Sequence, residues 1–515
     1  MSRADRLALL FSLLAVLAAY LVTERVFERM AHIEDEMAYV WQAQAIARGR
    51  LTIPSPSHPK SFLVPFVVDY QGQRFGKYPP GWPAILALGI LLGERSLVNP
   101  LLAGLGVWLT YHLGKRCLGE ASGLLAVLLT LSSPFFLMNS GSLLSHPFGL
   151  VLSAGFAMAW LDSWDGAFQE TGDGQAVPAF RRWLPVVVGA LCLGVLALTR
   201  PLTAVAVALP FGLHGLYLLV RGGAQVRRKL LVFCAIVLAL VALYFVWQYA
   251  VTGDALHNPY TLWWEYDRVG FGPGFGRTQR GHNLNQAWIN TRFSLRVGAY
   301  DLFGWAAYSW VFLPLGLLAA LRNRRLLLLG SVFPSLVVLY LAYWIGANLF
   351  GPRYYYEGLY SLTLLSAAGI ALLAGWPTRP GEPWRSFTGW RRARPLGVTG
   401  LLALLLSLNL AFYAPLRVGG MHGLYLVNRA RLQPFLSPQA QEYTPALVIV
   451  HPDKWTEYGA LLELQDPFLD TPFIFVISRG RAADEAVSAE FPNRSVYHYY
   501  PEEPYVFYTS PRPDS

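Results

Sequence analysis

The chain has 515 residues, of which 54% are hydrophobic and 14% charged, and it contains 17 Trp, 27 Tyr and 29 Phe. This composition is far from that of ordinary soluble domains and indicates an integral membrane protein. The net charge of +10 does not indicate nucleic-acid binding, because Lys and Arg gather in short segments between apolar blocks. The three cysteines form no CxxC pair, so neither a disulfide framework nor a cysteine metal site is expected.

Apolar blocks, each near the roughly 20 residues that cross a bilayer, recur along residues 1–414. We predict eleven spanning helices, at residues 7–28, 98–114, 121–138, 146–162, 184–199, 202–220, 230–250, 302–320, 326–345, 358–375 and 398–414. The block from Gly81 to Leu92 is short and follows two prolines, so we expect an interfacial or re-entrant helix there. The sequence therefore predicts an all-α polytopic membrane region over residues 1–414.

The charges of the loops predict an orientation. If the N-terminus is cytoplasmic, every inside loop is basic, with clusters at Lys115-Arg116, Arg181-Arg182, Arg221 to Lys229, Arg322 to Arg325, and Arg385 to Arg394. The opposite face then receives a first outer loop, 29–97, a long outer loop, 251–301, and the tail from 415. This pattern obeys the positive-inside rule. We expect a multi-pass protein of the bacterial plasma membrane.

The tail differs from the rest of the chain. Its apolar runs Ala446–Val450 and Pro472–Ser478 alternate with polar, helix-compatible stretches at Thr456–Leu464 and Ala482–Glu490. Short apolar runs that alternate with helical segments are typical of small α/β folds. Residues 415–515 are therefore predicted to form an extracytoplasmic α/β domain.

Three adjacent carboxylates, Glu34, Asp35 and Glu36, follow the first predicted span. Like charges this close raise one another's pKa, which prepares a carboxylate to act as a general base. The alternative interpretation is a solvated helix start, because acidic residues favour the N-terminal end of a helix.

Three cations stand beside prolines on the predicted outer face. They occur in Lys77-Tyr78-Pro79-Pro80, in Arg200-Pro201 and in Pro352-Arg353-Tyr354. Each one alone is explained by a side chain that reaches lipid phosphates at the membrane surface. Together they favour a site that holds a substrate phosphate, because Arg binds phosphate oxygens in a bidentate manner and Lys adds a point charge.

Further polar residues lie on the same face. His146 opens a predicted span and either joins the site or anchors its helix. The long outer loop contains Asp254, His257 and His282 near Trp263-Trp264. Aromatic rings stack on sugars while Asp and His reach hydroxyls, so the loop fits a carbohydrate-binding lid, although Trp pairs are equally usual at membrane interfaces.

No cofactor is expected from this sequence. Asp254, His257, Asp267 and His282 together match no compact metal-ligand spacing, as a protein-bound zinc or transition metal would require. Oxygen-ligand sites are encoded more loosely, so a divalent cation stays open.

The chain resembles the integral-membrane GT-C glycosyltransferases, in particular the polyprenyl-phosphate-mannose protein mannosyltransferase and aminoarabinose-transferase group. The resemblance covers most of residues 1–375, and its motifs are Asp35-Glu36, Lys77-Tyr78-Pro79-Pro80-Gly81, Thr199-Arg200-Pro201 and Arg353-Tyr354.

The resemblance implies an inverting enzyme that moves a sugar from a polyprenyl-phosphate donor to an acceptor hydroxyl. Asp35 would be the base, while the extra acid Glu34 leaves open which carboxylate acts, with Glu36 the second catalytic candidate. Lys77 would bind the donor phosphate, together with Arg200, Arg353 and Tyr354. The remaining substrate-binding candidates are Glu34, Tyr78, His146, Asp254, His257 and His282.

The expected partners are this donor, a lipid, glycan or protein acceptor, and membrane lipids. Two other functions fit the same residues. A transporter or flippase of lipid-linked sugars would also use basic sites at the membrane surface, but the spans hold few ionisable groups and show no inverted repeat. An oligosaccharide ligase or polymerase would differ in using a pyrophosphate-linked donor.

Overall fold

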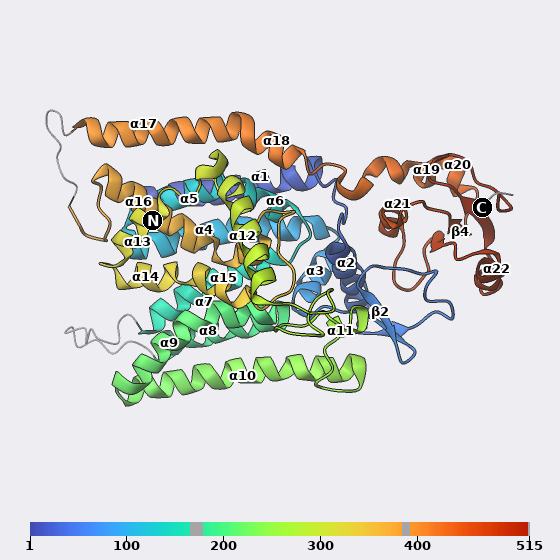
Figure 1. Cartoon of the computed structure of the whole chain (residues 1–515), viewed down its shortest axis with the longest axis horizontal. Helices are drawn as coiled ribbons and strands as arrows, with labels where there is room; N and C mark the ends of the chain where they lie inside the picture. The colour runs from blue at the N-terminus through green and yellow to red at the C-terminus, as the bar shows by residue number, and fades with distance from the viewer. Residues whose placement is uncertain (165–178, 384–391, 513–515) are drawn as a thin grey trace.

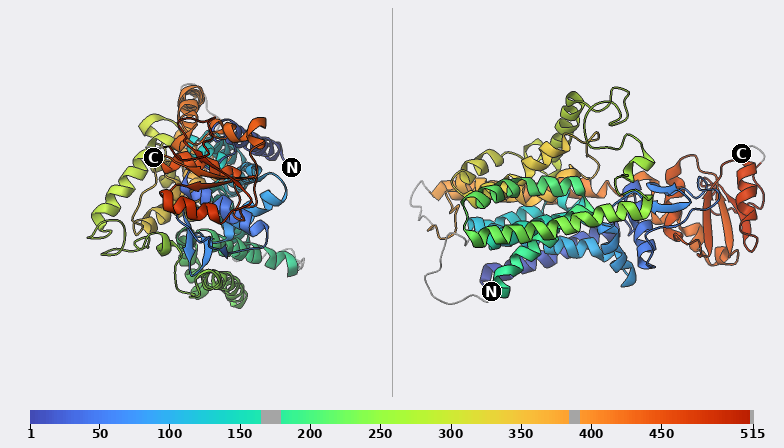
Figure 2. Two further views of the ribbon diagram at one scale, coloured as in Figure 1. Left: turned by 90° about the vertical axis from the view of Figure 1, so that its right-hand side faces the viewer. Right: turned by 90° about the horizontal axis from the view of Figure 1, so that it is seen from below.

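The computed structural model describes residues 1–164, 179–383 and 392–512. The molecule is elongated, with a bundle of helices at one end and a smaller α/β unit at the other (Figure 1, Figure 2). Two residues of the last predicted inside loop, Arg385 and Arg391, lie outside the described residues.

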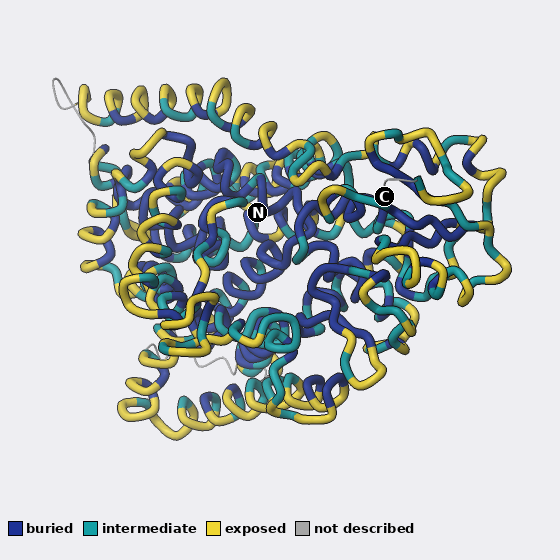
Figure 3. The backbone as a smooth tube through the Cα atoms, turned by 45° about the vertical axis from the view of Figure 1, so that its right-hand side comes forward, coloured by how far each residue is buried: buried dark blue, intermediate teal, exposed yellow. Residues whose placement is uncertain are grey.

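Fifteen of the described helices build the bundle. They are α1 (Arg3–Arg25), α4 (Val98–Leu118), α5 (Glu120–Leu131), α6 (Pro134–Gly141), α7 (His146–Trp164), α8 (Ala179–Thr199), α9 (Pro201–Arg221), α10 (Ala224–Thr252), α12 (Leu284–Asp301), α13 (Leu313–Ala320), α14 (Arg324–Gly330), α15 (Val332–Tyr340), α16 (Leu359–Ala374), α17 (Ala393–Leu408) and α18 (Ala414–Gly419). Helices α7 and α16 are almost entirely buried, whereas α10 and α17 expose rows of Leu. Figure 3 shows this contrast between interior and peripheral helices.

Six of the described helices are long and apolar enough to cross a membrane, or eight if each of two bent pairs is one span. The bent pairs are α5 with α6, at 63°, and α12 with Ala306–Ala320, at 106°. The prediction of eleven spans is not confirmed. Its span 326–345 is broken into the short helices α14 and α15.

Two predicted spans coincide with helices that fall outside this set. Helices α4 and α7 lie inside the bundle, where their polar side chains contact protein. Asn99 of α4 donates to the carbonyl of Leu144 at 2.9 Å, and Ser153 of α7 lies 3.2 Å from the Tyr360 hydroxyl. A helix surrounded by other helices does not need the apolar surface that lipid requires.

The predicted inside loops gather at one end of the bundle. Asn323 donates to the carbonyl of Cys117 (2.7 Å), Lys229 donates to that of Ser163 (3.3 Å), and Arg394 donates to that of Leu372 (2.8 Å). The first outer loop, α11 (Tyr260–Trp263) and the C-terminal α/β unit lie at the other end (Figure 1). The basic loops thus lie at the opposite end of the bundle from the segments that carry the candidate site residues, as the predicted topology requires.

The first outer loop folds into helix α2 (Glu34–Ala47), a small antiparallel sheet and helix α3 (Gly81–Leu91). The sheet has the order β1 (Ile53–Pro54), β3 (Gln73–Gly76), β2 (Val67–Tyr70), which the sequence did not predict. Helix α3 is about 16 Å long at 1.5 Å per residue, too short for a hydrocarbon core of roughly 30 Å. This agrees with the expected interfacial or re-entrant helix.

The C-terminal unit contains a parallel sheet with the order β5 (Phe473–Ile477), β4 (Ala446–Val450), β6 (Ser495–Tyr499). Helical segments α21 (Trp455–Gly459), 460–464 and α22 (Arg481–Ala489) connect the strands. Two short helices, α19 (Gln433–Leu436) and α20 (Pro438–Gln441), precede the sheet. Strands β4 and β5 and the helices match the expected positions. Strand β6 was missed because its polar and aromatic residues do not form an apolar run.

Single cysteines test the orientation. In a chain whose three native cysteines are replaced by Ala, Asp254→Cys should react with a membrane-impermeant maleimide added to intact cells, and Arg322→Cys only after permeabilisation. Both positions are exposed, and the positive-inside rule puts the basic end in the cytoplasm. The opposite labelling pattern would contradict the assigned orientation.

Candidate active site

Segments that are far apart in the sequence enclose a cavity of about 410 Å³ between the bundle and its outer loops. This volume is in the range of sites for small ligands. The predicted site residues that line it are Glu34, Asp35, Lys77, Tyr78, Arg200, Arg353 and Tyr354. Much of the remaining lining is aromatic, including Tyr260, Trp264 and Trp344.

Asp35 is the second residue of α2, and both of its carboxylate oxygens accept hydrogen bonds. The Tyr78 hydroxyl donates to Oδ1 at 2.6 Å, and Arg353 Nη2 donates to Oδ2 at 3.2 Å. Burial raises the pKa of Asp35, but the attraction of Arg353 and the hydrogen bond from Tyr78 outweigh it and hold the pKa below its usual value. Asp35 is therefore ionised at neutral pH and able to accept a proton.

Glu36 has a different environment, although it adjoins Asp35. Its Oε2 accepts the backbone N–H groups of His32 (2.8 Å) and Ile33 (3.2 Å), and its Oε1 accepts that of Leu143 (2.7 Å). Burial raises the pKa of Glu36 to about 7. Glu36 does not line the cavity, whereas Asp35 does, and the Glu36 carboxylate joins α2 to the segment before α7.

Lys77 follows strand β3 and is held within aromatic rings. Its Nζ lies 3.0 Å from Asp267 Oδ2 and 3.7 Å from the centre of the Phe66 ring. Burial lowers the pKa of Lys77, while Asp267 opposes this shift. Asp267 also accepts hydrogen bonds from Tyr343 and Trp344. Lys77 thus joins the first and the long outer loops.

Arg200 occupies the junction between α8 and α9, where Pro201 begins the new helix. Its Nε lies 3.1 Å from Glu357 Oε1, and its Nη2 donates to the Tyr340 hydroxyl at 3.1 Å. His146 Nδ1 lies 3.2 Å from the same Glu357 oxygen and is buried behind the cavity. His146 and Glu357 therefore position Arg200.

Arg353 lies directly after Pro352 and has one guanidinium nitrogen available. Its Nη2 bonds to Asp35, but its Nη1 is buried without a hydrogen-bond partner among the described residues. The Tyr354 ring lies 5.7 Å from Arg353 and 5.9 Å from Arg200. A buried donor without a partner costs free energy, and an anion in the cavity would satisfy it.

Three candidates from the long outer loop lie outside the cavity. Asp254 is exposed and accepts the N–H of Leu256 in its own turn. His257 packs on Tyr70, and His282 is buried against Phe271 and the carbonyl of Leu341. Within the described residues, no group of three or more His, Cys, Asp and Glu is arranged to hold a metal ion.

Sequence reasoning missed several residues of the site. Glu357 was overlooked because it directly precedes the predicted span 358–375, and Asp267 was considered only as a metal ligand. Arg277 stacks against Trp264 and Trp344 at 5.2 and 5.3 Å, and Tyr425 reaches the cavity from the segment after α18. A search for lone charges at the ends of apolar blocks would have found Glu357.

No protein-family model matches the sequence, and no curated protein matches it. Solved structures match its fold. ArnT from Cupriavidus metallidurans bound to undecaprenyl phosphate has 15% sequence identity and a TM-score of 0.56, over 95% of this chain and 89% of that chain. The same protein in the apo state has 14% identity and a TM-score of 0.56, over 96% and 90%.

The Archaeoglobus fulgidus oligosaccharyltransferase in complex with Zn and sulfate has 14% identity and a TM-score of 0.46, over 90% of this chain and 62% of that chain. The likeness to ArnT extends over nearly the whole of both chains. It shows that this chain has the fold of ArnT, in agreement with the resemblance of its sequence motifs.

The different environments of Glu36 and Glu34 give a stability prediction. Glu36→Gln places an amide N–H against a backbone N–H donor, so it should lower the free energy of unfolding by about 1–3 kcal/mol. Thermal unfolding in detergent measures this loss, with Glu34→Gln as the matched control, because among the described residues the Glu34 side chain is bonded to its own backbone N–H and to that of no other residue. Equal melting temperatures for the two variants would contradict the structural role of Glu36.

Proposed function

We propose that this protein is an inverting glycosyltransferase that moves a sugar from a polyprenyl-phosphate donor to an acceptor hydroxyl at the outer face of the membrane. The observation that carries the proposal is Asp35 with the Arg353 guanidinium, because together they put a base and an unpartnered phosphate-binding donor in one cavity. The similarity to ArnT, whose structure holds undecaprenyl phosphate, supports this donor class.

The reaction follows from these groups. The ionised Asp35 accepts the proton of the acceptor hydroxyl while the hydroxyl oxygen attacks the anomeric carbon of the sugar. The bond between that carbon and the phosphate oxygen breaks on the opposite side, which inverts the anomeric centre and releases the polyprenyl phosphate. Negative charge grows on the leaving phosphate, and preorganised cations stabilise it in a site shielded from water.

The charge balance of the cavity favours a donor with a single phosphate. Arg353 is paired with Asp35, Lys77 with Asp267, and Arg200 with Glu357. Arg277 is the fourth cation in the lining, and it lies on the long outer loop. A pyrophosphate would bring more negative charge than these already compensated groups are arranged to accept, which distinguishes the proposal from a ligase or polymerase.

The buried charges also argue for chemistry rather than transport. The carboxylates and cations of the site are bound to one another at the outer end of the bundle. A transporter that alternates its access places its substrate site near the middle of the membrane. Glycosyl transfer at the outer face is therefore the function that the geometry supports best.

The role of Asp35 predicts the effect of a conservative substitution. Asp35→Asn should lower sugar transfer by about a hundred- to ten-thousand-fold, the usual contribution of a general base. Membranes that contain the variant are incubated with a panel of radiolabelled polyprenyl-phosphate sugars, and product is counted. Asp254→Asn, an exposed carboxylate outside the cavity, is the matched control and should retain transfer. Unchanged transfer by Asp35→Asn at equal abundance would remove Asp35 from the mechanism.

The free nitrogen of Arg353 predicts the donor class. Arg353→Lys keeps the charge but loses the forked donor, so the Kd for undecaprenyl phosphate should rise about tenfold or more. Binding to the purified protein in detergent measures this, with Arg280→Lys, exposed on the long outer loop, as the control. Tighter binding of undecaprenyl pyrophosphate than of the monophosphate would instead support the ligase or polymerase function.

A further inference from the structure

The segment between α18 and the C-terminal unit has an unusual backbone. Tyr425 and Leu426 have φ values of 55° and 65°, a left-handed conformation that residues other than glycine rarely adopt. Glu28 and Arg29, just before α2, form a second such pair, with φ of 49° and 61°. Glu28 Oε2 accepts the backbone N–H of Arg429 at 2.8 Å. One strained pair is therefore bonded to the chain three residues after the other.

This strained segment brings an aromatic ring to the catalytic cavity. Tyr425 lines the cavity together with Glu34 and Asp35, and 44% of its surface is exposed. Val427, which follows the strained pair Tyr425-Leu426, is fully buried and anchors the segment. Strained backbone persists only where the surrounding structure fixes it, and such positions concentrate at functional sites. The strained backbone places Tyr425 in the cavity lining with the acidic first turn of α2.

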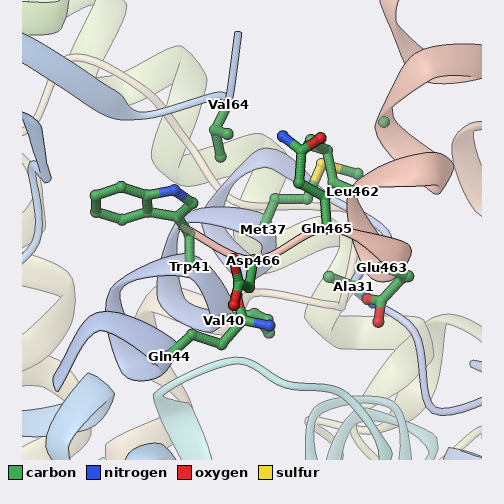
Figure 4. A pocket seen from close by; sticks show the side chains of 11 residues that line it. Ala31, Met37, Val40, Trp41, Gln44, Val64, Leu462, Glu463, Gln465 and Asp466 are labelled. Carbon is green, nitrogen blue, oxygen red and sulfur yellow. The ribbon is translucent and has the colours of Figure 1, made fainter. Parts of the chain in front are cut away.

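The C-terminal unit also supports α2 from behind. At about 100° per residue, Asp35 and Tyr39 lie on one face of α2, and Met37, Val40, Trp41 and Gln44 lie on roughly the opposite face. The first two line the catalytic cavity, whereas the other four meet residues 459–466 of the C-terminal unit. Figure 4 shows these side chains around a narrow gap between the two parts.

Both ends of α2 are held by the same unit. Glu463 accepts the backbone N–H of Ala31 at 2.8 Å, just before the helix begins. Arg48, at the helix end, pairs with Asp466 and with Asp470, each at 2.6 Å. The helix that carries Asp35 is thus fixed by the C-terminal unit, while Tyr425 covers the front of its first turn.

The lining around Asp35 combines cations with an acid and an aromatic ring. Lys77, Arg200 and Arg353 reach the cavity from the bundle and its loops, and these are the groups proposed to hold the donor phosphate. Tyr425 and Glu34 line the same cavity and add an aromatic ring and an acid, a combination suited to hydroxyl-bearing or amine-bearing groups. The acceptor must approach Asp35, and this pair is where the C-terminal unit meets the site.

We propose that Tyr425 and Glu34 form the acceptor-binding edge of the cavity. This edge binds a hydroxyl-bearing sugar that is uncharged or cationic rather than one that is phosphorylated. The inference rests on the proposed glycosyl transfer and assigns the C-terminal unit a part in it. The unit positions both sides of the acceptor site, with α2 on one side and the Tyr425 segment on the other.

Binding of soluble probes tests this edge separately from the donor site. The purified protein is first saturated with undecaprenyl phosphate, and methyl glucoside, methyl glucosaminide and glucose 6-phosphate are then compared by saturation-transfer NMR. The two methyl glycosides should bind, and glucose 6-phosphate should not. Tyr425→Gly, which retains the left-handed backbone without its strain, should weaken glycoside binding about tenfold, or ~1.4 kcal/mol, and leave the Kd for undecaprenyl phosphate within about twofold.

Leu426→Gly is the matched control, because it relieves the same strain in the neighbouring residue and removes no side chain from the cavity lining. It should leave the binding of both glycosides unchanged. Absence of glycoside binding, preference for glucose 6-phosphate, or equal effects of the two glycine variants would each overturn the acceptor edge while the donor function stands. Failure of the wild-type protein to bind undecaprenyl phosphate would instead count against the proposed function.

Discussion

Each of three cations at the cavity is balanced by a carboxylate from another part of the chain. Asp35 pairs with Arg353, Asp267 with Lys77, and Glu357 with Arg200. A charge removed from water costs several kcal/mol unless a partner and further hydrogen bonds compensate it. The cavity therefore depends on the meeting of the first outer loop, the long outer loop, the α8–α9 junction and the segment 353–358 that precedes α16. Few charged groups of the cavity have a donor that is available to a ligand. Arg353 Nη1 is one, because it has no hydrogen-bond partner among the described residues.

The arrangement explains why so much of the structure lies outside the bundle. Helix α2 presents Asp35 to the cavity only if both of its ends are fixed, and the C-terminal unit fixes them through Glu463, Asp466 and Asp470. The exposed pair at Arg48 contributes little free energy alone, but the packing of Met37 and Trp41 on residues 459–466 adds buried apolar surface. The C-terminal unit is thereby connected to the site rather than appended to it.

Local signals in the sequence predicted a large part of this site. Charges beside prolines identified Lys77, Arg200 and Arg353, because a proline restricts the backbone next to the cation. The acidic run that forms the first turn of α2 identified Asp35. The sequence did not separate Asp35 from Glu36, since that distinction depends on the backbone N–H of Leu143, more than a hundred residues away.

Other features of the site depend on contacts between distant segments, which the sequence does not display. The pairing of Glu357 with Arg200 and the arrival of Tyr425 at the cavity are of this kind. The predicted number of eleven spans is not confirmed: apolar blocks such as 326–345 break into short helices, and the described residues provide six to eight candidates by length and composition. Composition predicts that a segment is buried, but it does not tell whether lipid or protein surrounds it.

A structure of the protein with undecaprenyl phosphate in a lipid nanodisc tests the central claim most directly. The account predicts that the phosphate lies in the cavity within hydrogen-bond distance of Arg353 Nη1, with Asp35 facing the space left for sugar and acceptor. A phosphate bound outside the cavity, or at the basic end of the bundle near Arg322, would contradict it.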